Sequence, residues 1–113
     1  MKKRRNRAVL EGAVERASST RRRAVALYQL ALFHDNNSRE AVAIPLYEKA
    51  LMNGLPTNLK AHTLAWLASS FYKTGKPRRA LPRLRQSRAI TTDRALLKFL
   101  DGLEARINLR ITG

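Results

Sequence analysis

Apolar residues recur at helical spacing in the second half of the chain. They occupy positions i, i+3, i+4 and i+7, which form one face of an amphipathic helix: Leu64, Leu67, Ala68 and Phe71. Gly75 and Pro77 mark the end of this helix and the start of another, because glycine favours the position just past a helix and proline the first helical position. The second helix directs Ala80, Leu81, Leu84 and Ser87 inward. The pattern predicts an antiparallel helical hairpin.

The same pattern occurs a second time, 37 residues upstream. Its members, Leu27, Leu30, Ala31, His34, Ala43, Tyr47 and Ala50, correspond in order to Leu64, Leu67, Ala68, Phe71, Ala80, Leu84 and Ser87. Because one hairpin cannot bury its apolar face alone, we expect the two hairpins to stack.

These units resemble the tetratricopeptide repeat family, in which a leucine and a small residue precede an aromatic, and a small residue and an aromatic follow in the second helix. The second unit matches this pattern well, whereas the first has His34 at the aromatic position and Ser38 at the turn glycine. The spacing exceeds the family's repeat of about 34 residues, and the surplus lies in a lengthened turn at residues 52–58. The segments AVAIPLYEKALMNGL and DRALLKFLDGL are similar to small bacterial members. The resemblance covers roughly residues 24–108.

The sequence predicts an all-α fold, a short tetratricopeptide-like α-solenoid of two stacked hairpins with a capping helix at each end. Six helices are expected, near residues 7–17, 21–35, 39–52, 58–73, 77–90 and 93–108. Ser18, Ser19 and Thr20 offer N-cap side chains before the second helix, as do Thr91, Thr92 and Asp93 before the last. Residues 109–113 carry no assignment.

The predicted domain organisation is a basic flexible arm at residues 1–7 followed by a single helical domain at 8–113. Within this domain we place repeat one at 24–56, repeat two at 60–92 and the capping helix at 93–108. The last helix fits the family in two registers. One places Leu100 at the family's leucine and Lys98, Phe99 and Arg106 toward the groove, and the other buries Phe99.

Positive charge is concentrated at the two ends of the chain. Lys and Arg number 23 against 8 Asp and Glu, a formal net charge of +15, of which residues 1–23 contribute +7 and residues 60–113 contribute +9. The candidate basic surface comprises Arg21, Arg22, Arg23, Arg78, Arg79, Arg83 and Arg88. Such a field favours an anionic partner. A face that is merely solvated is the alternative.

The family resemblance implies a concave groove lined by the first helix of each repeat. Carried over to this sequence, the partner-binding residues are Tyr28, Gln29, Leu32, Asn36, His62, Trp66, Ser69, Tyr72 and Lys73, with Lys98 from the last helix. Large amphipathic aromatics are typical anchors of binding surfaces. For Trp66, packing against the last helix is the alternative to groove contact.

Catalytic chemistry has little support in the sequence. There is no phosphate-binding glycine loop, nucleophile motif or paired-carboxylate cluster, and we predict no enzyme activity, no cofactor and no metal site. Cysteine is absent, which suits a cytoplasmic protein, and no apolar run reaches the roughly 18 residues of a membrane span. Two functions are therefore considered: a scaffold that binds a peptide or partner protein, acidic in character, and alternatively a protein that binds RNA or DNA. The oligomeric state is left open.

Overall fold

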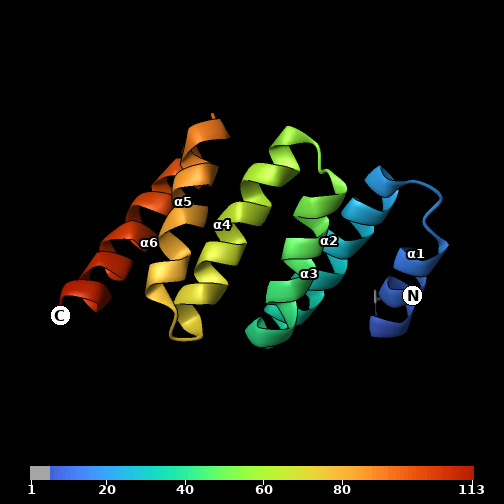
Figure 1. Cartoon of the computed structure of the whole chain (residues 1–113), viewed down its shortest axis with the longest axis horizontal. Helices are drawn as coiled ribbons and strands as arrows, with labels where there is room; N and C mark the ends of the chain where they lie inside the picture. The colour runs from blue at the N-terminus through green and yellow to red at the C-terminus, as the bar shows by residue number, and fades with distance from the viewer. Residues whose placement is uncertain (1–5) are drawn as a thin grey trace, which may run out of the picture. The chain divides into compact units, whose positions relative to one another are not determined.

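The computed structural model describes residues 6–113, which form six α-helices and no strand. The helices are α1 (Arg7–Arg16), α2 (Thr20–Asn36), α3 (Glu40–Asn53), α4 (Thr57–Lys73), α5 (Pro77–Ile90) and α6 (Arg94–Thr112) (Figure 1). The predicted all-α class is confirmed, and the helix ends agree with the predicted ones to within one residue, with a single exception. Helix α6 continues to Thr112, so residues 109–112 extend it beyond the predicted end at 108.

The chain divides into two compact units, with the boundary between Leu55 and Pro56. The N-terminal unit contains α1 to α3, and the C-terminal unit contains α4 to α6. The single domain at 8–113 therefore stays a prediction. The predicted basic arm lies outside the described residues except for its last two positions, and Arg7 there already belongs to α1.

Side chains cap three of the helices at their N-termini. The Asn6 side chain accepts a hydrogen bond from the Val9 amide, and Ser19 Oγ accepts one from the Arg22 amide at 3.1 Å. Asp93 Oδ1 accepts from the amides of two residues in the first turn of α6, at 2.9 and 3.2 Å. The caps at Ser19 and Asp93 confirm the starts predicted for α2 and α6, because each satisfies amides that lack a partner within the helix.

The same turn ends α2 and α4. Arg39 N donates to His34 O at 2.9 Å, and Ser38 N donates to Asp35 O at 3.0 Å. In the C-terminal unit, the amides of Lys76 and Gly75 make the corresponding bonds at 2.8 and 3.2 Å. Both turns have the Schellman pattern, in which one residue adopts the left-handed conformation. Ser38 has φ of 60° where Gly75 has 79°.

In the N-terminal unit α2 and α3 form the predicted hairpin, and α1 packs against α2. The buried residues of the hairpin include every member of the predicted inward set: Leu27, Leu30, Ala31, His34, Ala43, Tyr47 and Ala50. The Tyr47 hydroxyl donates to Asp35 Oδ2 at 2.7 Å, which links α3 to the end of α2. Leu10 is the buried residue of α1.

In the C-terminal unit α4 and α5 form the second hairpin, and α6 packs against both. Ser87 Oγ donates to Ala61 O at 2.7 Å within this hairpin, so the polar residue at the end of the inward set has a partner. Helix α6 buries Leu96, Leu100, Leu103 and Ile107. Lys98 and Arg106 are exposed and Phe99 is half-buried rather than buried, which agrees with the register that places Leu100 at the family's leucine position.

His34 is buried and tied to the turn that follows α2. Its Nδ1 accepts a hydrogen bond from Arg39 Nε at 2.9 Å, so the ring is neutral in this arrangement. Burial lowers the pKa of His34 below its ordinary value, and the guanidinium groups of Arg39 and Arg7 lower this pKa further, against a smaller opposing effect of Glu11. The folded protein thus disfavours the imidazolium form.

We expect substitution of Ala68 by Leu to destabilise the protein by about 1–3 kcal/mol, because the added methylenes overpack a filled core. Ala68 has no exposed surface, and Ala31 at the equivalent position has none either. Ala31→Leu should behave alike. Exposed Ala41 on α3 is the control, and Ala41→Leu should change the stability by less than about 0.5 kcal/mol. Urea unfolding midpoints measure the stability of all three variants. Wild-type midpoints for Ala68→Leu and Ala31→Leu would contradict this packing.

We expect stability to fall as the pH is lowered through the ordinary His pKa of about 6.5. A folded-state pKa below the unfolded one means that the unfolded chain binds more protons in this window, so acid favours unfolding by at most about 1.4 kcal/mol per pH unit. The contribution of His34 to the stability is fully present at pH values above the unfolded-state pKa. His34→Phe should reduce the pH dependence of the urea midpoint between about pH 7.5 and 5.5. An unchanged pH dependence of the urea midpoint in the His34 variant would refute the assignment of this effect to His34.

Candidate partner-binding surfaces

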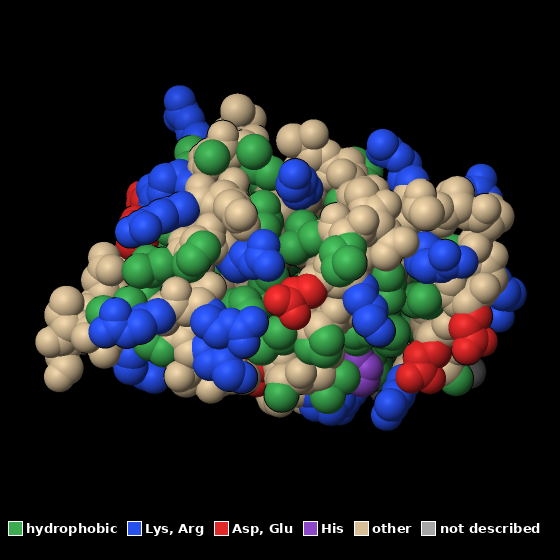
Figure 2. Space-filling model, viewed as in Figure 1, with side chains coloured by type: hydrophobic (Ala, Val, Ile, Leu, Met, Phe, Trp, Pro, Cys, Tyr) green, Lys and Arg blue, Asp and Glu red, His purple; other side chains and the backbone are tan. Residues whose placement is uncertain are grey.

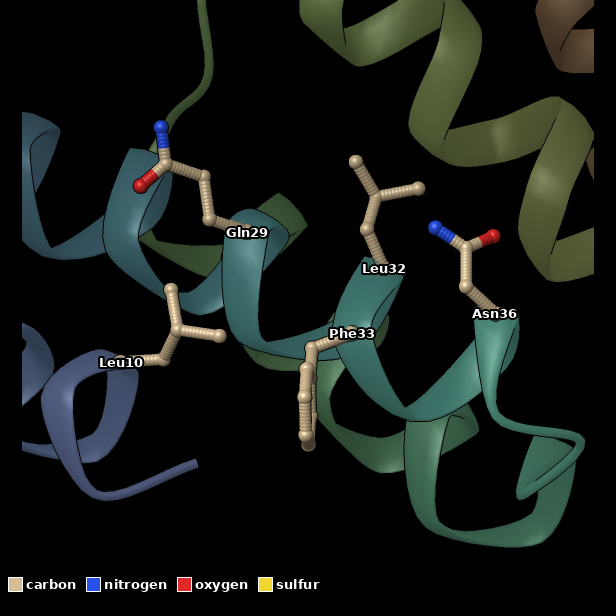
Figure 3. Close-up of a pocket in the computed structure, with 5 residues that line it drawn as sticks. All are labelled: Leu10, Gln29, Leu32, Phe33 and Asn36. Atoms are coloured by element: carbon tan, nitrogen blue, oxygen red, sulfur yellow. The ribbon is translucent and has the colours of Figure 1, made fainter. Parts of the chain in front are cut away.

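A pocket of about 270 Å³ lies between α1 and α2 in the N-terminal unit. Its lining consists of Leu10, Gln29, Leu32, Phe33 and Asn36 (Figure 3). Gln29, Leu32 and Asn36 project from one side of α2, and Leu10 extends from α1. The walls are therefore mainly aliphatic and aromatic, with two amide side chains that can each donate and accept hydrogen bonds.

Three of the four groove residues predicted in this unit line the pocket. The fourth, Tyr28, lies with its ring centroid 6.5 Å from that of Tyr47 on α3. The sequence did not indicate the contributions of Leu10 and Phe33. It predicted a capping helix at residues 7–17, but not that this helix would close one side of a pocket.

In the C-terminal unit Trp66 is part of an aromatic cluster. Its ring lies 5.1 Å from Phe99 of α6, edge to face, and 5.9 Å from the ring of His62. Trp66 is half-buried. The alternative considered for this residue, packing against the last helix, is therefore observed, while groove contact stays a prediction.

The remaining predicted groove residues of this unit have different surroundings. Tyr72 is half-buried beneath Arg110, whose guanidinium carbon lies 4.8 Å from the ring centroid. Ser69 is half-buried, and Lys73 and Lys98 are exposed. A second pocket, of about 300 Å³, contains His62 at one wall, between the start of α4 and residues 90–93. Among the groove residues predicted in this unit, His62 lines this pocket, and a shared groove for the set stays a prediction.

The predicted basic surface divides into residues with different partners. Arg21, Arg22 and Arg23 are exposed in the first turn of α2, and Arg78 and Arg79 are exposed on α5. Arg83 donates to Gln86 Oε1 at 3.1 Å. Arg88 instead bridges α5 to α6, because it donates to Asp101 Oδ1 and Glu104 Oε1, each at 2.6 Å. Arg88 therefore has a structural role that the sequence analysis missed.

On the face shown in Figure 2, most of the charged side chains over α4, α5 and α6 are Lys and Arg.

No helix within residues 6–113 has the length and apolar character needed to cross a membrane. Over the same residues, no group of three or more His, Cys, Asp or Glu side chains is placed to hold a metal ion.

Two helical hairpins with the same inward pattern and the same turn define a helical-repeat protein. A family model described as tetratrico peptide repeat matches residues 24–107. The chain therefore belongs to the tetratricopeptide repeat family, whose members generally serve as non-catalytic protein interaction modules. No curated protein matches the chain significantly, and no solved structure does.

The contact between Trp66 and Phe99 can be tested by fluorescence, because Trp66 is the one tryptophan of the chain. We expect Phe99→Ala to shift the emission of Trp66 to the red and to increase its quenching by acrylamide, since the substitution exposes the indole. Loss of the aromatic pair should lower the stability by about 0.5–1.5 kcal/mol beyond the effect of lost buried area. Leu109→Ala, at a position that is 72% exposed, is the control. Equal spectra for both variants would contradict the packing.

Proposed function

We propose that this protein is a non-catalytic scaffold that binds a peptide segment of a partner protein, with one apolar side chain of that segment in the pocket between α1 and α2. The observation that carries this proposal is that Gln29, Leu32 and Asn36, which the family resemblance assigns to the groove, line that pocket. A family of protein interaction modules makes a peptide or protein the expected ligand.

The order of residues along α2 suits an extended peptide. Gln29 and Asn36 are seven residues apart, about 10.5 Å along the helix, and Leu32 lies between them. An extended chain rises about 3.3 Å per residue, so backbone groups three residues apart have a similar spacing. Side-chain amides can bond the backbone of such a peptide, while Leu32, Leu10 and Phe33 contact a side chain between the two bonds.

An acidic partner fits the charge of the chain. The net charge of +15 attracts negatively charged segments and accelerates their encounter with the protein. The pocket lining itself contains no charged residue. We therefore assign the apolar anchor to the pocket and the acidic residues to flanking positions of the peptide.

On the C-terminal unit, taken by itself, we propose a second set of partner contacts. Tyr72 and Trp66 each keep part of their surface exposed, and Lys73 and Lys98 carry positive charge that attracts acidic segments. Ser69 and His62 complete the set. We also propose a cytoplasmic location, which agrees with the absence of cysteine.

The test uses a random peptide library selected on the immobilised, nuclease-treated protein. We expect the selected peptides to share an aliphatic or aromatic residue flanked by acidic residues. Leu32→Asp should weaken the binding of a selected, labelled peptide by roughly 30-fold or more, because the loss of a central anchor contact commonly exceeds 2 kcal/mol. Fluorescence anisotropy gives the dissociation constants.

Val42→Asp is the matched control. Val42 is 43% exposed on α3 and outside the pocket, and its substitution changes the net charge by the same amount. This variant should bind the selected peptides with nearly wild-type affinity. Equal losses in the two variants would assign the effect to charge, and unchanged affinity of Leu32→Asp would exclude the pocket as the binding site.

A further inference from the structure

A long acid-free segment includes all of α4 and α5. Between Glu48 and Asp93 the chain has no acidic residue and nine basic ones. Helix α5 alone carries five arginines. Ordinary solvated surfaces mix both signs of charge, so this segment departs from the usual composition of a surface that only faces water.

The few acidic residues of the C-terminal unit already have partners inside it. Asp93 caps the start of α6 through Oδ1, and Asp101 and Glu104 both bind Arg88. These carboxylates therefore cap α6 or hold it against α5. Four exposed basic residues remain along α5 and at its N-terminus, and we call them the α5 ridge: Lys76, Arg78, Arg79 and Arg85. Within residues 6–113, no ion pair joins the α5 ridge to an acidic side chain.

The geometry of the α5 ridge suits a row of anions. Arg78 and Arg85 are seven residues apart, so they lie on the same side of the helix about 10.5 Å from each other. Arg79 has its guanidinium carbon 4.6 Å from the centroid of the Phe71 ring. Stacking on an aromatic face holds the guanidinium in place, and its planar fork matches phosphate oxygens.

We propose that the α5 ridge binds the phosphate backbone of a nucleic acid. A membrane surface is a poorer match, because membrane-bound helices insert large apolar side chains. The apolar residues Ala80 and Leu84 of α5 are buried, and none of its exposed residues is a large hydrophobic. An acidic peptide is a poorer match as well, since peptide binding relies on an anchor side chain in a pocket, and none of the residues of the α5 ridge lines either pocket described above.

Backbone binding has a measurable salt dependence. If the α5 ridge neutralises about four phosphates, the slope of log K against log salt should be about −2.8 for single strands and about −3.6 for duplex DNA. Between about 50 and 200 mM salt the affinity should then fall roughly 50- to 150-fold. Labelled single-stranded RNA and labelled duplex DNA, measured by fluorescence anisotropy, distinguish the two polymers by affinity and slope.

The decisive comparison uses two double variants with equal net charge. Arg78→Gln with Arg85→Gln removes two contacts of the α5 ridge and should reduce the magnitude of the salt slope by about 1.4 on single strands and about 1.8 on duplex DNA. Lys49→Gln with Lys60→Gln removes two exposed charges outside the α5 ridge. This second variant should keep the wild-type slope. Circular dichroism checks that both retain their helix content.

Three outcomes would overturn the proposal. Equal reduction of the slope in both variants would show attraction by net charge alone. Absence of binding to either nucleic acid at about 50 mM salt would exclude nucleic acid as the ligand of the α5 ridge, because non-specific attraction to so basic a protein should be measurable at that salt concentration. Tighter binding to phosphatidylserine vesicles or to polyglutamate than to nucleic acid would assign the α5 ridge to a membrane or to an acidic protein. None of these results affects the peptide site between α1 and α2.

Discussion

Both hairpins depend on the same type of turn. In each, a residue with left-handed backbone conformation reverses the chain within three residues of the helix end. The bonds from Arg39 N to His34 O and from Lys76 N to Phe71 O have the same place in the two units. They fix where the second helix starts, and thereby which residues of the two helices meet. In the N-terminal unit a serine replaces the glycine, and the hydrogen bond between the side chains of His34 and Arg39 joins the two ends of that turn a second time. A neutral histidine at the aromatic position is therefore part of the turn.

The features predictable from the sequence are those that local chemistry determines. Helical spacing of apolar residues, caps at Ser19 and Asp93, and left-handed turns depend on neighbours in the chain. The predicted end of α6 at residue 108 was wrong, because the helix continues to Thr112. Between residues 108 and 113 the sequence has no proline, and its first glycine there is Gly113. The Thr112 hydroxyl also bonds the Asn108 carbonyl in this last turn.

The side-chain partners of the candidate site could not be predicted in the same way. Arg88 lies in a run of arginines that look alike in the sequence, and its role depends on Asp101 and Glu104 on another helix. The contact of Trp66 with Phe99 was one of two alternatives, because the face of a helix alone does not say which neighbour covers it. Such pairings depend on how separate helices approach each other, which the pattern within one helix does not determine.

Arginines on one helix thus have two physical roles. Arg88 draws Asp101 and Glu104 toward α5, which holds α6 in place and leaves these two carboxylates paired. Neither carboxylate pairs with Arg78 or Arg85. The ion pairs that join the last helix therefore neutralise Arg88 and leave the α5 ridge without an acidic partner among the described residues. Helix packing and anion attraction in this unit are coupled through a small supply of acidic residues.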